Sequence, residues 1–175
     1  TSGDKRTVIG ASLIDSFYPV REDIFKFYSA GAVIQFSKSF AKEEMVSENF
    51  FFLVVDALKN IAYGEEIPQS YLVKFLLSAL SLVGYALNIE GCFTCGKNIT
   101  GRVFFEYSCG GFFCEDCKGK YAREINLSTL NALKTAKSGD TLSKEQSLFS
   151  LKLLDYYITN KTEEKLSALK ELIKI

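Results

Sequence analysis

Apolar residues recur at helical intervals through most of this chain. In residues 21–40 the apolar positions fall three or four apart, and Pro19 stands just before them as a helix-entry signal. A second apolar stripe runs through residues 53–61 and stops at Gly64. These two patterns predict two amphipathic helices in the first part of the chain.

Residues 71–87 form the most hydrophobic stretch, with apolar side chains on every side of a helical projection. The stretch contains Lys74, Ser81 and Gly84, and it is shorter than the run of about 18 uncharged residues that spans a bilayer. Pro68 lies close to its start, where the first helical turn tolerates proline. We therefore expect a buried helix at the centre of a bundle.

Helix signals return in the last third of the chain. Ser128 is the predicted N-cap of a short helix that ends before Gly139. Ser143 and Gln146 form a capping box for a longer helix after it. Thr162 is expected to open a final helix, with two glutamates following it at the positive end of the helix dipole.

Two short segments favour strand. Residues 8–14 are an apolar run rich in branched side chains, and residues 102–107 carry bulky side chains that suit a pleated surface. The predicted fold class is mainly α: a helical bundle with an inserted four-cysteine zinc-binding module, a small hairpin in that module, and a short N-terminal strand remnant.

The clearest chemical signal is a pair of Cys-x-x-Cys motifs. Cys92 and Cys95 form the first, and Cys114 and Cys117 form the second after 18 intervening residues. A tight turn lets each motif present two sulfurs to one ion, and tetrahedral zinc takes two such pairs. Four thiolates leave no open position for a substrate, so the pattern predicts structural Zn²⁺ rather than a catalytic metal.

Other interpretations of the cysteines stay open. Four thiolates also hold iron or an iron–sulfur cluster, and one motif alone can act as a redox dithiol, although the sequence lacks the βαβ context typical of the latter. Cys109 lies outside both pairs and is interpreted as a spare thiol near the site. The odd number of cysteines and the motif spacing argue against a disulfide framework and indicate a reducing compartment.

Composition narrows the classes of function. The chain has 175 residues, of which 47% are hydrophobic, enough for one good core. Its 21 basic and 21 acidic residues give a formal net charge of zero, so no global field attracts nucleic acid or membrane. The absence of histidine excludes Ser-His-Asp and Cys-His catalysis and the zinc deaminase signature. We expect a binding protein rather than an enzyme.

The order of these features resembles the bacterial recombination mediator family RecO. The matching segments are FYPVREDI at residues 17–24, LVGYAL at 82–87, CFTCG at 92–96 and GGFFCEDC at 110–117. A Gly-Tyr pair shortly before one cysteine motif, with a Gly-Gly pair just ahead of the other, is a specific combination. The resemblance covers the chain from about residue 8 onward.

The resemblance implies a non-catalytic protein of DNA repair, with an N-terminal OB-fold followed by a helical domain that carries a zinc insert. Residues 1–18 would be the last strand of the OB-fold and a linker, residues 19–175 the helical domain, and residues 92–117 the insert. Such proteins bind DNA, anneal complementary strands, contact the tail of single-stranded DNA-binding protein, and with RecR help to load RecA. Their place is the bacterial cytoplasm, at the nucleoid, without a membrane.

Nearly all of that OB-fold lies outside this sequence, which begins at Thr1 rather than at a methionine, so we expect a trimmed chain and DNA binding mainly through the missing part. Lys118, Lys120 and Arg123 follow the second cysteine motif and are candidate contacts to nucleic acid or to an acidic partner. A solvated loop with ordinary basic residues is the other interpretation. The alternative function is a zinc-stabilised helical protein-interaction subunit unrelated to DNA, in line with the zero net charge.

Overall fold

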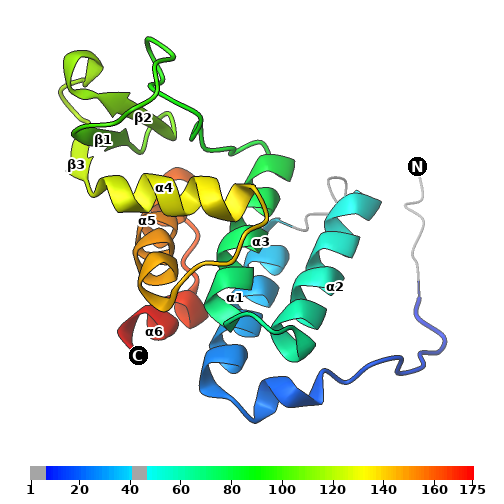
Figure 1. Ribbon diagram of the computed structural model, residues 1–175. Coiled ribbons are helices and arrows are strands. Elements are labelled where there is room, and N and C mark those ends of the chain that lie inside the picture. Colours follow the sequence, from blue (N-terminus) through cyan, green and yellow to red (C-terminus); the bar gives the residue numbers. More distant parts are fainter. Residues whose placement is uncertain (1–6, 41–46) are drawn as a thin grey trace, which may run out of the picture.

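The computed structural model describes residues 7–40 and 47–175, which form a helical bundle with a small antiparallel sheet at one end (Figure 1). The helices are α1 (Ile24–Phe40), α2 (Glu48–Tyr63), α3 (Pro68–Leu82), α4 (Leu127–Lys137), α5 (Lys144–Thr162) and α6 (Ser167–Lys174). The strands are β1 (Val103–Glu106), β2 (Gly111–Cys114) and β3 (Arg123–Ile125), in the order β2-β1-β3. The predicted mainly helical fold class is confirmed.

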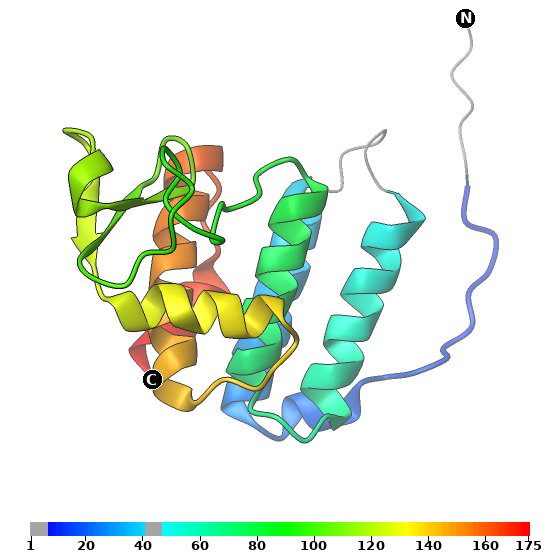
Figure 2. The same ribbon diagram turned by 45° about the horizontal axis from the view of Figure 1, so that its top comes forward.

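Helix α3 lies at the centre of the bundle, as its all-round hydrophobicity predicts, and packs against α1, α2, α4 and α5 (Figure 2). The side chains of Leu72, Val73, Leu76, Ala79 and Leu80 are fully buried. These five residues cover one broad face of α3, whereas Ser78, Ser81 and Leu82 on the other side are exposed, so the helix is buried on its inner face rather than all round.

This central helix is shorter than the hydrophobic stretch that predicts it. It ends at Leu82, and Gly84 then adopts a φ of +83°, a left-handed conformation that suits glycine. The Tyr85 N–H donates back to the Leu80 carbonyl at 2.7 Å, which closes the helix end. Residues 85–87 therefore lie in the segment that leads to the first cysteine motif.

The capping box of α5 is confirmed, but two other predicted helix starts are wrong. The Ser143 Oγ accepts from the Gln146 N–H at 3.2 Å, and the Gln146 side chain accepts from the Ser143 N–H at 2.9 Å. Helix α4 is capped by Asn126, not by Ser128, because the Asn126 Oδ1 accepts the Ser128 N–H. Thr162 ends α5 rather than opening the last helix.

The late start of α6 follows from tertiary contacts. Helix α5 continues to Thr162 because Tyr157 and Ile158 are buried in the core. Glu163 then takes a left-handed φ of 61° and stops the helix. Helix α6 packs against α1, where the Gln35 side chain accepts from the Ala168 N–H at 3.0 Å and so holds the first turn of α6.

The sheet contains the predicted hairpin and one further strand. β1 and β2 pair with Phe104 opposite Phe113 and Phe105 opposite Phe112. β3 pairs on the other edge of β1, with Val103 opposite Ile125. The sequence did not indicate β3, since three residues with one apolar side chain show no alternation.

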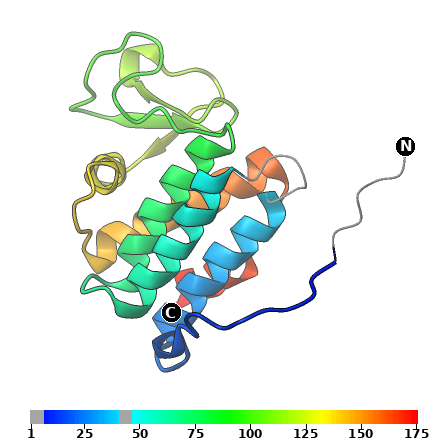
Figure 3. The ribbon, with the colours of Figure 1, turned by 90° about the vertical axis from the view of Figure 1, so that its right-hand side faces the viewer.

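The strand predicted for residues 8–14 is absent from the described chain. This segment is an extended arm beside the bundle, and Val8, Ile9, Leu13 and Ile14 are each at least 81% exposed (Figure 3). A strand needs a neighbour for its N–H and C=O groups, and none of the described residues pairs with this segment. The division at residue 18 and its OB-fold interpretation stay a prediction.

We expect Leu76→Ala to lower the free energy of unfolding by about 3 kcal/mol, because it leaves a cavity in the central helix. Leu82→Ala, at a side chain that is 50% exposed on the same helix, should cost less than about 1 kcal/mol. Urea unfolding of both variants measures the difference. Equal losses would contradict the central position of α3.

Candidate functional site

The first cysteine motif sits in a tight turn after α3. The Cys92 N–H donates to the Lys97 carbonyl and the Gly96 N–H donates to the Cys92 carbonyl, both at 2.8 Å. Gly96 has a φ of +70°, so glycine suits this position of the turn. The Phe93 N–H donates to the Phe112 carbonyl at 2.7 Å, which holds the turn against β2.

The second motif begins where the sheet ends. Cys114 is the last residue of β2, and Cys117 closes a short 3₁₀ helix, Glu115–Cys117. The antiparallel pairing of β1 with β2 fixes where Cys114 emerges, and the single 3₁₀ turn then brings the sulfur of Cys117 back towards it.

All four predicted ligands come together. The Sγ atoms of Cys92, Cys95, Cys114 and Cys117 lie within 4.8 Å of one another, and those of Cys95 and Cys114 are 4.0 Å apart. A tetrahedral zinc with Zn–S bonds of about 2.3 Å would place its sulfurs about 3.8 Å apart. The donor set and its spacing therefore fit one tetrahedral metal ion, and Cys109 lies outside the group.

The pKa values of two of these thiols, Cys92 and Cys117, are shifted in opposite directions. Burial raises the pKa of Cys92, but hydrogen bonds from the backbone of Cys95, Cys114 and Thr94 outweigh it and lower the pKa to about 6. Hydrogen bonds to Cys114 and Cys95, together with burial, raise the pKa of Cys117 to about 12. Four sulfurs this close repel one another as thiolates, and a bound divalent ion would compensate that charge.

The module that carries the cysteines shares the core of the bundle. Phe105 packs on Phe112 with ring centroids 4.6 Å apart and on Tyr157 of α5 at 6.0 Å. The Tyr157 hydroxyl donates to the Tyr85 carbonyl at 3.2 Å. A Cβ on Gly110 would lie 2.8 Å from that hydroxyl, so this approach needs glycine. The buried residues of the sheet and of the helices form one continuous cluster.

The predicted contact residues after the second motif do not form one group. The Lys118 Nζ lies 4.2 Å from the centroid of the Phe104 ring and 4.0 Å from a Glu115 oxygen. Next to it, Arg102 donates to Glu124 and Glu115, so its charge is already paired within the module.

Lys120 and Arg123 lie elsewhere, beside tyrosines. The Lys120 Nζ is 5.8 Å from the centroid of the Tyr121 ring. The guanidinium carbon of Arg123 is 5.6 Å from the centroid of the Tyr156 ring on α5. Their role as contacts to nucleic acid or to a partner stays a proposal.

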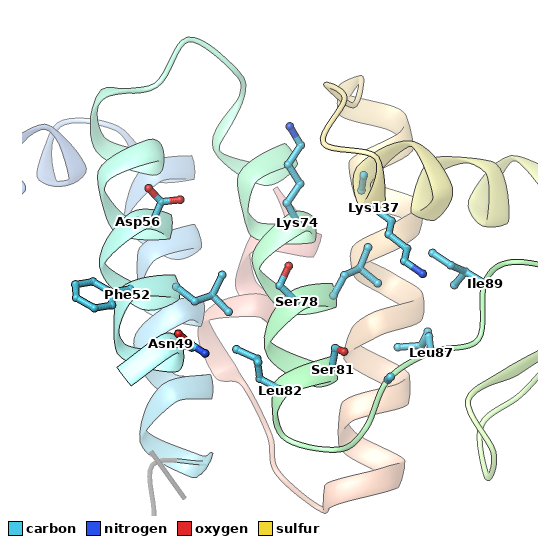
Figure 4. Close-up of a pocket in the computed structure, with 14 residues that line it drawn as sticks. Asn49, Phe52, Asp56, Lys74, Ser78, Ser81, Leu82, Leu87, Ile89 and Lys137 are labelled. Atoms are coloured by element: carbon cyan, nitrogen blue, oxygen red, sulfur yellow. The ribbon is translucent and has the colours of Figure 1, made fainter. Parts of the chain in front are cut away.

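A cavity of about 630 Å³ opens between α2, α3, α4 and the segment after α3 (Figure 4). Leu53, Leu82 and the half-exposed ring of Phe52 line it, with Lys74 and Lys137 among the polar lining residues. The sequence did not reveal this cavity, because periodicity shows which side chains face inward and not how closely two helices approach.

Lys74 belongs to a polar network that joins α3 to the α4–α5 loop. Its Nζ donates to both carboxylate oxygens of Glu66, at 2.7 and 2.9 Å, and to the Gly139 carbonyl at 2.7 Å. Ser70 donates to Glu66 at 2.7 Å and accepts from the Leu142 N–H at 3.1 Å. Burial raises the pKa of Glu66, but these hydrogen bonds outweigh it and hold the pKa below its ordinary value.

A family model described as "Recombination protein O C terminal" matches residues 21–170, which is most of the chain. The chain belongs to the RecO family. The resemblance to RecO is thereby confirmed, and the protein is a member of a DNA repair family.

Several curated RecO relatives carry the name "DNA repair protein RecO". The protein of Thermoanaerobacter sp. is 28% identical over 130 residues, which cover 73% of this chain and 52% of the relative. That of Streptomyces griseus is 33% identical over 115 residues, covering 65% and 46%. That of Symbiobacterium thermophilum is 25% identical over 174 residues, covering 93% and 69%. The chain spans about half the length of the first two.

Among the described residues, none of the helices combines the length and the apolar character needed to cross a bilayer.

We expect Cys95→Ser to weaken metal binding at least tenfold, because it removes one of four ligands. Elemental analysis after dialysis against a chelator measures the metal that each variant retains. Cys109→Ser is the matched control and should retain as much metal as the wild type. Metal loss from both variants alike, or less than one metal per wild-type chain with freely reactive thiols, would contradict the site.

We expect the stability that Glu66 contributes to be present above about pH 4.5, the ordinary pKa of its carboxyl, and to be lost as the pH falls through its lower folded value. Glu66→Gln should lower the free energy of unfolding by about 1–2 kcal/mol at neutral pH. It should also make that free energy depend less on pH in the acid range. Urea unfolding across the acid range measures both effects. Glu90→Gln is the control, since that carboxylate is 74% exposed and screened by solvent. If the free energy of unfolding of Glu66→Gln fell with acid as it does in the wild type, the stabilising role of the Glu66 network would be contradicted.

Proposed function

We propose that this chain is the helical and zinc-binding part of a mediator of DNA repair and homologous recombination. In this role it is a non-catalytic scaffold that helps to load recombinase on gaps covered by single-stranded DNA-binding protein. The observation that carries the proposal is the family match over residues 21–170, with the four-cysteine cluster inside it. The name shared by the relatives supports a repair role and disfavours a subunit unrelated to DNA.

Zn²⁺ is the proposed ion, held by Cys92, Cys95, Cys114 and Cys117. The motif spacing is of the zinc type, and the sulfur cluster has room for a tetrahedral ion without a fifth protein ligand. A closed tetrathiolate site stabilises a fold and offers no position at which a substrate could react. The zinc would therefore fix the sheet and its loops rather than take part in catalysis.

The proposed partner for the cavity is the tail of single-stranded DNA-binding protein, an acidic peptide with an aromatic end. The apolar walls around Leu53 and Leu82 suit an aromatic ring, and lysines in the lining suit carboxylates. Lys74 already donates hydrogen bonds to the Glu66 carboxylate and to the Gly139 carbonyl. Lys137 pairs only with Glu90 among the described residues, and both side chains are more than half exposed, so this lysine can change partners at little cost.

The proposed scaffold also has partners beyond this cavity. The other proposed partners are RecR and DNA, with DNA bound mainly through an OB-fold outside these residues. The proposed location is the cytoplasm, at the nucleoid during repair.

Binding of a labelled tail peptide, measured by fluorescence polarisation, tests the docking site. We expect Lys137→Gln to weaken binding about two- to fivefold and Phe52→Ala by a similar factor, since each removes a contact at the cavity. Lys152→Gln, at an exposed position of α5 that does not line the cavity, is the matched control.

The same measurement includes a peptide whose terminal aromatic is replaced by alanine. It should bind much more weakly than the native tail. Equal affinities for the two peptides would reject docking of the aromatic end, and equal losses in Lys137→Gln and Lys152→Gln would show that any surface lysine suffices.

A further inference from the structure

Three tyrosines gather where the cysteine module meets α5, apart from both the sulfur cluster and the cavity. Tyr107 directly follows β1, Tyr121 lies in the loop before β3, and Tyr156 lies on α5. Together with Arg123 they line a depression of about 250 Å³. We call these four residues the tyrosine surface.

Tyr107 is partly buried against the core and packs on Tyr156, while the other two rings reach the surface. The centroids of Tyr107 and Tyr156 are 4.1 Å apart, with the ring planes inclined by 55°. Tyr121 is 75% exposed and Tyr156 is 37% exposed, so aromatic area is open to solvent. No hydrogen bond joins the hydroxyls of these three tyrosines to another described side chain or carbonyl, unlike the hydroxyl of the buried Tyr157.

Positive charge surrounds these rings. The guanidinium of Arg123 lies over the Tyr156 ring and forms no salt bridge with the part of the chain that the structure describes. Lys120 approaches the Tyr121 ring in the same way, and Lys161 donates to the backbone carbonyl of Ser108 at the rim. Glu106 is the one carboxylate in the lining among the described residues, and it accepts from Ser108.

Open aromatic faces beside uncommitted cations match one class of ligand well. In single-stranded nucleic acid the bases are free to stack on tyrosine rings, while the phosphates meet lysine and arginine. The bases of a duplex are already stacked within the helix and cannot stack on such rings. A peptide without aromatic groups would use the cations and leave the rings bare.

We propose that the tyrosine surface binds single-stranded nucleic acid. A base stacks on Tyr121, the most exposed of the three rings, and Arg123, held over Tyr156, contacts an adjoining phosphate together with Lys120. The inference rests on the proposed function in DNA repair, and it gives this chain its own contact with the strand, separate from an OB-fold.

Fluorescence anisotropy of a short labelled oligothymidine, with this 175-residue chain, tests the inference. We expect Tyr121→Ala to weaken binding about fivefold or more through the lost stacking, and Tyr156→Ala to weaken it by removing the ring over which Arg123 lies. Tyr121 is so exposed that its variant should fold normally, which keeps the test valid if Tyr156→Ala loosens α5. Phe51→Ala, at an aromatic residue of α2 that is 57% exposed, is the matched control and should bind as the wild type does.

Two further probes separate stacking from charge. An abasic strand of equal length should bind the wild type more weakly and respond little to Tyr121→Ala. Arg123→Gln should reduce the slope of log affinity against log salt by about 0.7, the value for one phosphate contact on a single strand.

The inference is overturned if the wild type does not bind oligothymidine, if abasic and base-carrying strands bind equally, or if Tyr121→Ala binds as the wild type does. An acidic peptide whose binding depends on Tyr121, with the oligonucleotide unaffected, would overturn it in favour of a peptide site. Loss of tail-peptide binding in Phe52→Ala with unchanged oligonucleotide binding separates the cavity from this surface, so either proposal can fail without the other.

Discussion

Four sulfurs held within 4.8 Å of one another impose the main constraint on this protein. Thiolates at that separation repel, and thiols alone offer only weak hydrogen bonds, so the arrangement is stable when a cation supplies the attraction. The two turns that carry the sulfurs are otherwise joined by a few backbone hydrogen bonds and three short strands. Strands of three or four residues are shorter than usual, and such a fixed point or packing on a helix stabilises the sheet they form.

The module also has this packing, because Phe105, Phe112 and Tyr157 carry its core directly into that of the bundle. The module is therefore part of the bundle rather than an independent appendage. Phe112, which packs on Phe105, lies on β2, the strand that ends at Cys114. Loss of the ion should therefore spread from the sulfurs through the sheet and towards the face of α5 that meets it, while α1 and α2 lie farther away.

The sequence predicts those features that a single segment determines. Helical periodicity and the Ser143–Gln146 pair locate most of the bundle, and the spacing of the cysteines is enough to indicate that they act as one group. The late start of α6 needs a partner from elsewhere in the chain, since Gln35 of α1 holds the Ala168 N–H. The cap of α4 is a local alternative that periodicity does not separate: the Asn126 Oδ1 accepts the Ser128 N–H two residues on.

The candidate surfaces lie beyond sequence reasoning because each combines residues from separated segments. The cavity depends on how far α2 stands from α4, and the tyrosine surface brings together Tyr107, Tyr121 and Tyr156 from three separated segments. No local pattern links such residues. The sequence did indicate Arg123 as a candidate contact. The structure adds that its guanidinium lies over the Tyr156 ring, which no local pattern predicts.

Hydrogen–deuterium exchange of the metal-loaded and the chelated protein is the sharpest test of the structural role of the ion. We expect chelation to remove protection from the amides of β1, β2 and β3 and from the two cysteine turns, while the amides of α1 and α2 keep theirs. Unchanged protection in the three strands after complete metal removal would contradict that role.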